Sequence, residues 1–151
     1  MSGAAISIET NAAEFAGAVN VIAERCGSAQ PAMEIIGEAV VASVQRNFEE
    51  GGRPNGWQPL SPVTTAMKKG GSILVGKGFG GGLLGSIHAE AQPDVVYIGT
   101  DKVYGAIHQL GGQAGRGRKV TIPARPFLMV QDEDIAAINE MLADFILQGN
   151  L

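Results

Sequence analysis

A stripe of apolar residues at helical spacing constrains the fold of this chain more than any other feature. Within residues 31–50, an apolar side chain recurs at every third or fourth position, at Met33, Ile36, Val40, Val44 and Phe48. This spacing predicts a helix with one buried face. Pro31 suits the first turn of that helix, and Gly51-Gly52 suits its end. We expect the stripe to face a core, in preference to forming a groove for a partner.

Two further helices are expected, near residues 12–26 and 132–148. The first has the spacing of a capping box at Asn11 and Glu14, and the second begins with the acidic run 132–134. The apolar stripe of the first helix consists of Phe15, Val19 and Ile22. The stripe of the second consists of Ile135, Ile138, Leu142, Phe145 and Ile146. Both stripes predict helices that pack on a core.

Five short segments have the composition of strands, near residues 5–9, 73–75, 87–91, 95–99 and 119–123. Between them, Ser61-Pro62 predicts the start of a short helix. Glycine is unusually common, at 22 of 151 residues, and it concentrates in the runs 70–82 and 111–117. We therefore expect one α+β domain over residues 1–151. A small, mostly antiparallel sheet would be packed by two N-terminal helices and one C-terminal helix, with long glycine-rich loops.

The segment from Val95 to Val130 is expected to organise the chain. It predicts a strand, a short amphipathic segment at 102–110, a glycine- and arginine-rich loop at 111–118, and a second extended run at 119–123. Cations gather there, at Lys102, Arg116, Arg118, Lys119 and Arg125. These five residues are the candidate contacts to a neighbouring subunit or to the phosphates of DNA. They could touch phosphate without reading sequence, remain on a solvated loop, or become ordered only against another subunit.

Charge is unevenly distributed along the chain, whose net charge is −4. Residues 1–50 carry seven acidic and two basic residues, residues 51–130 carry three and nine, and residues 131–151 carry five and none. A basic centre between acidic ends could steer a polyanion or let identical subunits meet head to tail. Acidic helices that are simply soluble would give the same pattern.

The sequence does not favour a catalytic, nucleotide or metal site. Residues 71–77 fit the start of a P-loop, but Gly78 stands where the magnesium-binding hydroxyl is needed, and the GxGxxG match at 76–81 lacks a preceding strand. A catalytic triad would need Ser86 or Cys26 beside His88 or His108. The spacing of these residues matches no known nucleophile motif. We expect no enzyme activity and no cofactor or metal. The chain also lacks a membrane-length apolar run and a signal peptide, which predicts a protein made in a cytoplasm with no membrane partner.

Several motifs, taken in order, carry a family resemblance. They are Phe48–Gly51, Gly56-Trp57-Gln58-Pro59-Leu60-Ser61, Thr65 with Lys68, Ile73-Leu74, Leu83–Ile87, Val96–Gly99, Tyr104 with His108-Gln109-Leu110-Gly111, and Ile122-Pro123-Ala124-Arg125-Pro126-Phe127-Leu128. This set resembles the phage virion morphogenesis family, the tail completion proteins of Mu-like and related contractile-tailed phages. The resemblance runs from about Ile35 to the C-terminal helix. Two departures are the glycine run at 76–82 and Gly105, where the family tends to have alanine.

The resemblance implies a non-enzymatic structural protein of the phage or prophage virion, made in the host cytoplasm. Such a protein acts at the tail or neck, completing the tail or joining it to the head, beside other tail or neck proteins. A homo-oligomeric ring, six-fold by analogy, and contact with packaged DNA are expected. The motif residues expected to anchor loops and the short helix are Trp57, Leu60, Tyr104, His108, Gln109, Pro126, Phe127 and Leu128. The alternative is a small, sequence-neutral DNA-binding protein that uses segment 102–125.

Overall fold

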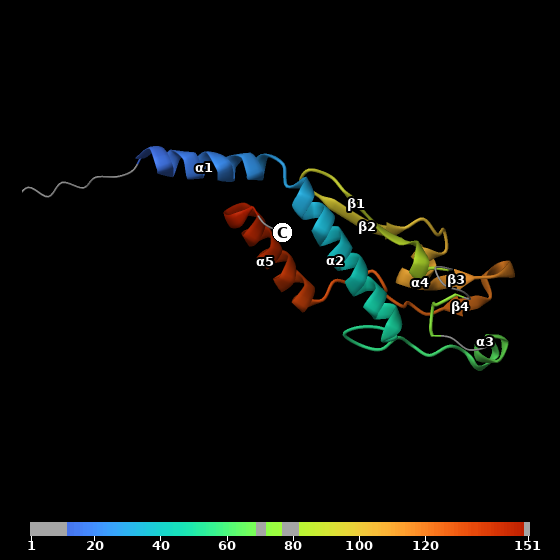
Figure 1. The fold of residues 1–151 in the computed structure, drawn as a ribbon. Helices are drawn as coiled ribbons and strands as arrows, with labels where there is room; N and C mark the ends of the chain where they lie inside the picture. Colours follow the sequence, from blue (N-terminus) through green and yellow to red (C-terminus); the bar gives the residue numbers. More distant parts are fainter. Residues whose placement is uncertain (1–11, 69–71, 77–81, 150–151) are drawn as a thin grey trace, which may run out of the picture.

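One long helix forms the centre of the molecule in the computed structural model, which describes residues 12–68, 72–76 and 82–149. A β-hairpin and a C-terminal helix lie along this central helix, and a second hairpin projects at the far end (Figure 1). The elements in order are α1 (Ala12–Gly27), α2 (Gln30–Glu49), α3 (Pro62–Met67), η1 (Leu84–Ser86), β1 (Ile87–Ala91), β2 (Val96–Thr100), α4 (Gly105–Leu110), β3 (Gly112–Ala114), η2 (Arg116–Arg118), β4 (Val120–Ile122) and α5 (Asp132–Gln148).

Helix α2 supplies the main buried face of the molecule. Its buried apolar residues are Ala32, Ile36, Val40, Val44 and Phe48, and it packs against β1, β2 and α5. The predicted core stripe is therefore confirmed, with Met33 only partly buried at its margin. Gly37 lets the hairpin approach closely, because a Cβ atom there would lie 2.9 Å from Ala89 Cβ.

The antiparallel hairpin β1–β2 covers one side of α2. Its register runs from Ile87 opposite Thr100 to Ala91 opposite Val96, and the amide of Gln92 donates to the carbonyl of Val95 at 2.8 Å to close the turn. Ile87, Val96 and Ile98 belong to the core or pack against it. Alternation therefore turns one face of the hairpin toward α2 and leaves Tyr97 on the other face, exposed.

The α+β class with antiparallel pairing is confirmed, but the strands form two separate two-stranded sheets. The strands expected near 87–91, 95–99 and 119–123 are present within one or two residues. Segment 73–75 contributes only an isolated bridge between Val75 and Gly82. The strand expected at 5–9 and the cap at Asn11 lie outside the described residues. The extra strand, β3, pairs with β4 in what was expected to be a glycine loop.

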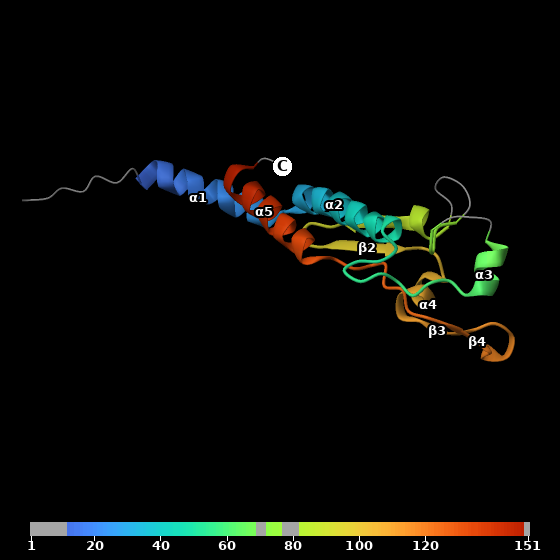
Figure 2. The same ribbon diagram turned by 90° about the horizontal axis from the view of Figure 1, so that it is seen from below.

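Helix α5 lies along the opposite side of α2 from the hairpin (Figures 1 and 2). A capping box starts it, with the Asp134 carboxylate accepting from the Gln131 amide at 2.8 Å, and Gly149 ends it in a left-handed conformation. Phe145 is buried, and Ile138 and Leu142 are partly buried against the core. Ile135 was predicted to share this stripe but is 50% exposed, because Asp134 takes the inward position in this turn and accepts from the Ser43 hydroxyl of α2.

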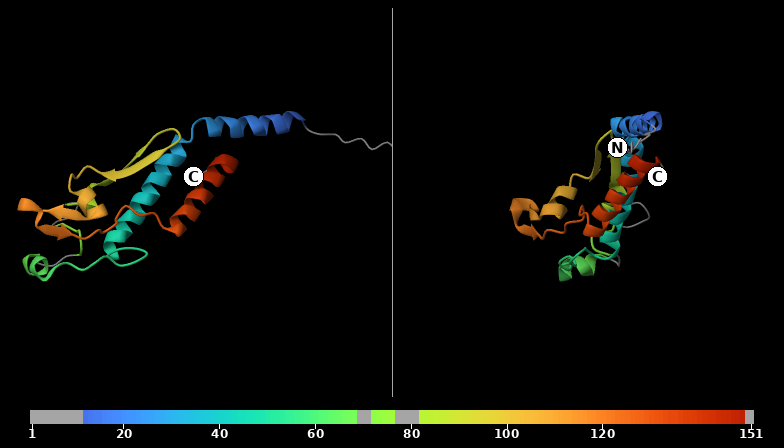
Figure 3. Two further views of the ribbon diagram at one scale, coloured as in Figure 1. Left: turned by 180° about the vertical axis from the view of Figure 1, so that it is seen from behind. Right: turned by 90° about the vertical axis from the view of Figure 1, so that its left-hand side faces the viewer.

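Helix α1 extends beyond the rest of the molecule (Figure 3). It touches the end of α5, where the Arg25 guanidinium donates to the carbonyl of Ile146 at 3.0 Å. Val19, expected to pack on a core, is 46% exposed, and the side chain of Phe15 lies outside the described part of the chain. The first predicted helix is therefore present but does not pack on the hairpin.

A buried polar side chain of α2 holds the chain that returns from the far end. Asn47 is 0% exposed, and its Nδ2 donates to the carbonyls of Phe127 and Met129 at 2.9 and 3.1 Å. Its Oδ1 accepts from Arg53 Nε at 2.9 Å. The Asn47 amide thus donates hydrogen bonds to backbone carbonyls that belong to no helix or sheet and that lie in a region from which water is excluded.

The same arginine ties the start of α5 to α2. Arg53 Nη2 donates to the backbone carbonyl of Ser43 at 2.8 Å, and its Nη1 pairs with Glu133 Oε1 at 3.0 Å. The Ser43 hydroxyl donates to Asp134 Oδ2 at 2.6 Å. Buried polar groups are therefore paired across α2, the loop after it and α5, and this pairing fixes their relative position.

We expect Asn47→Ala to lower the free energy of unfolding by about 2–4 kcal/mol, because two buried carbonyls and one guanidinium nitrogen lose their partner. Urea unfolding followed by circular dichroism measures this loss. Asn139→Ala, at an exposed position of α5, is the matched control and should change stability by no more than about 0.5 kcal/mol. Equal effects of the two substitutions would contradict the role given to Asn47.

Candidate functional site

A projecting hairpin made of β3, β4 and the turn between them is the most prominent surface feature, and we call residues 111–123 the arm. Gly112 pairs with Ile122 and Ala114 with Val120. Figure 2 shows the arm standing away from α2 and α5. The turn needs a positive φ at three positions, 78° at Gly115, 72° at Gly117 and 55° at Arg118. Glycine adopts such backbone without strain, which explains its occurrence at Gly115 and Gly117.

The five candidate cations separate into three groups. Arg116, Arg118 and Lys119 are exposed at the tip of the arm. Lys102 lies on the loop before α4 and pairs with Asp101 at 3.5 Å. The structure therefore brings three of the five together and leaves Lys102 apart from them.

Arg125 was predicted to belong to the contact surface, and for the single subunit this is wrong. The residue is only 5% exposed. Its Nε donates to the carbonyl of Gln58 at 3.0 Å and its Nη2 to the carbonyl of Pro59 at 3.1 Å. The guanidinium is used to satisfy two loop carbonyls, so it is part of the support beneath the arm.

Two of the resemblance motifs meet in space at this support. Besides the bonds from Arg125, Trp57 Nε1 donates to the carbonyl of Pro126 at 3.0 Å. Phe48 packs edge-on against Trp57, with ring centroids 5.5 Å apart, and lies 5.4 Å from the ring of Phe127. The loop after α2 and the segment after the arm are therefore fastened to each other and to α2. Leu60 and Leu128, the other expected anchors, are partly buried.

Gln109 of α4 holds the same segment from the other side. Its Oε1 accepts from the amides of Phe127 and Leu128 at 2.9 and 3.0 Å. The carbonyl of His108 accepts from the amide of Arg125 at 2.7 Å. Side-chain and backbone groups of α4 thus replace the neighbouring strand that the extended segment lacks.

His108 faces a small depression of about 270 Å³, lined by residues that include Leu60, Leu83 and Tyr104. Its Nδ1 is buried and has no hydrogen-bond partner within the described residues, and its ring meets that of Tyr104 edge-on at 6.1 Å. Burial, and secondarily the charge of Arg125, lower the pKa of His108 below its ordinary value. The histidine is therefore neutral in the folded protein near pH 7.

The departure at Gly105 has a steric reason. A Cβ atom at this position would lie 2.7 Å from Thr100 Cγ2, closer than carbon atoms pack. The residue is buried where α4 begins, against the end of β2. Alanine at this position would therefore need a different side chain or backbone path at Thr100.

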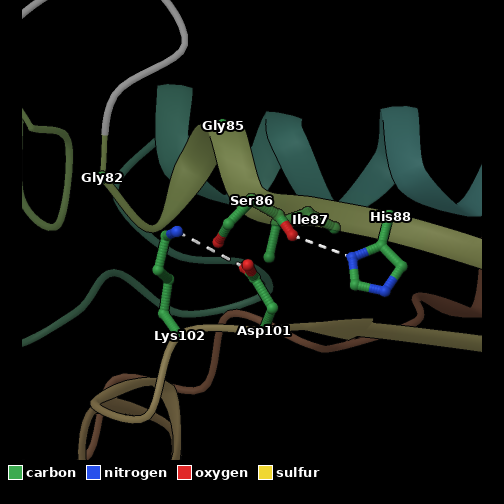
Figure 4. Close-up of a pocket in the computed structure, with 7 residues that line it drawn as sticks. All are labelled: Gly82, Gly85, Ser86, Ile87, His88, Asp101 and Lys102. Atoms are coloured by element: carbon green, nitrogen blue, oxygen red, sulfur yellow. Dashed lines mark hydrogen bonds and ion pairs between the residues drawn. The ribbon is translucent and has the colours of Figure 1, made fainter.

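An alternative to the arm is a shallow pocket of about 510 Å³ beside β1, shown in Figure 4. Ser86 and His88 both line it, but the ring of His88 is turned to the backbone carbonyl of Ser86, with Nδ1 at 3.1 Å. The Ser86 hydroxyl instead donates to the carbonyl of Leu83 at 2.8 Å, and Asp101 pairs with Lys102. These groups do not form a nucleophile, base and acid relay.

Other chemistry finds no support in the described residues 12–68, 72–76 and 82–149. No three side chains among them that bind metals lie close enough to share an ion. None of their helices combines the length and apolar character needed to cross a membrane. The GxGxxG match at 76–81 falls largely in the stretch 77–81, outside the described part, and the P-loop-like match at 71–77 has its two end residues, Gly71 and Lys77, outside it.

Gln109→Leu should release the backbone amides of Phe127 and Leu128, because the apolar side chain cannot accept hydrogen bonds from them. Amide hydrogen exchange measured by NMR should show these two amides exchanging at least about tenfold faster. Gln113→Leu, on the exposed face of β3, is the control and should leave them unchanged. Unaltered protection in Gln109→Leu would show that the segment is held without this side chain.

The lowered pKa of His108 predicts a pH-dependent stability. Because the folded state favours the neutral ring, the unfolded chain takes up the proton first as the pH falls below 6.5. The contribution is fully present above that pH and is lost as the pH falls toward the lower pKa of the folded state. The melting temperature of His108→Gln should therefore fall less between pH 7 and pH 5 than that of the native protein. Identical melting profiles for His108→Gln and the native protein would contradict the assignment.

Comparison with known proteins places these motifs in one family. A profile of the phage virion morphogenesis family matches residues 10–146. A relative named Mu-like prophage FluMu G protein 2, from Haemophilus influenzae, is 38% identical over 141 residues, which cover 93% of this chain and 95% of the relative. A second, the putative capsid assembly protein G of Escherichia phage Mu, is 32% identical over 103 residues, covering 62% of this chain and 64% of the relative. No solved structure matches significantly. The chain belongs to the phage virion morphogenesis family.

Proposed function

We propose that this chain is a non-enzymatic structural subunit that completes the phage tail or joins the tail to the head, acting within a homo-oligomeric ring in the virion. The observation that carries this proposal is the arm, which presents Arg116, Arg118 and Lys119 on a pre-shaped hairpin away from the core. A surface of this kind suits contact with another macromolecule, because its backbone is already ordered before binding.

The support beneath the arm favours the same role. Arg125, Gln109 and Trp57 all bond to the segment that follows β4, and none of them is free to act on a small substrate. The family's conspicuous motif residues are therefore used to hold a projecting element in place. Such use is expected of an assembly protein, whose contacts depend on a fixed geometry.

Electron microscopy of lysates from the parent phage or prophage with this gene deleted tests the proposal. Filled heads beside separate tails, or tails of abnormal length, are expected, because the junction between the two would be incomplete. Supplying the gene on a plasmid should restore joined particles. Normal, joined particles in the deletion would overturn the proposal. Loss of filled heads would also overturn it and would favour capsid assembly, the role named for the phage Mu relative.

A second candidate, a sequence-neutral DNA-binding protein, is favoured by the same three exposed cations. If they contact phosphate, binding to duplex DNA should weaken linearly on a log–log scale with salt, with a slope of about −2 to −3 for three neutralised phosphates. Fluorescence anisotropy between 50 and 300 mM salt measures the slope. The net charge of −4 opposes this function, and we expect no binding at about 150 mM salt. Tight, steeply salt-dependent binding would favour DNA over a protein partner.

A further inference from the structure

The outward face of α5 carries an unusual charge pattern that the fold does not explain. Glu133, Glu140 and Asp144 occur at positions i, i+7 and i+11, which fall on one face of a helix. All three are exposed. We call Glu140 and Asp144, with exposed Leu147 beside them, the acidic face.

The acidic face lacks counter-charges of its own. No lysine or arginine occurs in residues 131–151. In the described structure Glu133 pairs with Arg53, whereas Glu140 and Asp144 form no ion pair. Arg25, which approaches the last turn, donates to the carbonyl of Ile146. Negative charge near the carboxyl end of a helix opposes the helix dipole, so the isolated subunit is less stable for having Asp144 there.

The arm shows the opposite pattern. Its tip carries Arg116, Arg118 and Lys119 within four residues, and no acidic residue occurs between Asp101 and Asp132. None of the three forms an ion pair within the described residues. Val120 adds exposed apolar surface next to them. Like charges repel one another at the tip, and they do so on the acidic face as well. Contact between the two surfaces would reduce the repulsion within each of them.

The two surfaces cannot meet within one subunit. The arm and α5 lie at opposite ends of the body, with α2 and the β1–β2 hairpin between them (Figures 1 and 3). A contact between them must therefore join two molecules, and it uses two different patches. Such a head-to-tail contact builds a ring if the rotation that relates neighbouring subunits brings the last subunit back to the first. Otherwise it builds an open helical assembly.

We propose that the arm of one subunit binds the acidic face of α5 on the next copy of this chain. Arg116 and Arg118 would face Glu140 and Asp144, while Val120 and Leu147 would supply apolar contact. This inference rests on the proposed oligomeric function and names the surfaces that form it. Charge sets the register of the subunits, and the apolar pair excludes water from it.

Paired charge reversals test the contact, with sedimentation velocity and native mass spectrometry as readouts at about 50 mM salt, where exposed charges are weakly screened. The native protein should form oligomers beyond a dimer. Arg116→Glu with Arg118→Glu, and separately Glu140→Lys with Asp144→Lys, should each weaken association by at least about tenfold, because like charges would then oppose each other. All four changes in one chain restore the complement and the native net charge, so oligomers should return.

A mixture of the two double variants gives a further expectation. The native arm of the second variant is complementary to the native acidic face of the first, and the reversed arm of the first is complementary to the reversed face of the second. Oligomers in which the two variants alternate should therefore form in the mixture, although each variant alone stays weakly associated. The matched control is Glu90→Lys with Asp94→Lys, which makes the same charge change as the α5 variant on exposed residues of the β1–β2 hairpin, and it should assemble as the native protein does.

Several results would overturn the proposed contact without contradicting the proposed assembly function, which the deletion experiment tests separately. They are a monomeric native protein at low salt, no recovery in the four-fold variant, equal loss in the control, or loss of DNA binding with unchanged oligomers in the arm variant. Circular dichroism melting checks that each variant is folded. If a reversal unfolds the chain, the neutral changes Arg116→Gln with Arg118→Gln, and Glu140→Gln with Asp144→Asn, make the same test.

Discussion

The structure depends on how one extended segment, Pro126–Met129, is held without belonging to a sheet. Asn47 donates to it from α2, Trp57 donates to it from the loop after α2, and Gln109 accepts from it on α4. The segment carries Phe127 into the core at 0% exposure. It also joins the arm to α5, so its position decides where both lie. Burying extended backbone is tolerated only when its polar groups are paired, and here side chains supply that pairing.

The elements that could be predicted are those whose signal is local. The stripe of α2, the hairpin β1–β2, and the Ser61 cap of α3, which accepts from the Thr64 amide at 3.2 Å, follow from spacing and capping within a few residues. Strand β3 could not be predicted, because Gly112, Gln113 and Ala114 have neither alternation nor strand composition and pair only because β4 is brought beside them.

The functional surface was only partly predictable for a related reason. Arg116, Arg118 and Arg125 are alike in sequence, yet two are exposed and one is buried. What distinguishes Arg125 is a pair of carbonyls more than 60 residues upstream, and carbonyl acceptors leave no trace in the sequence. Asn47 was missed likewise, since a polar residue beside an apolar stripe does not show which distant backbone groups it will meet.

The anchoring of the arm bears on the energetics of assembly. A glycine-rich loop that became ordered only on binding would lose conformational entropy at that step, at a cost of about 1–2 kcal/mol for each residue fixed. In this chain the turn conformation and the strand pairing are formed in the subunit, so that cost is met during folding. Among residues 12–68, 72–76 and 82–149, the exposed cations of the tip and the acidic face form no ion pair, which lowers the stability of the single subunit slightly and favours any state in which these charges are neutralised. A subunit built in this way gains electrostatic stability when its exposed charges meet a complementary surface.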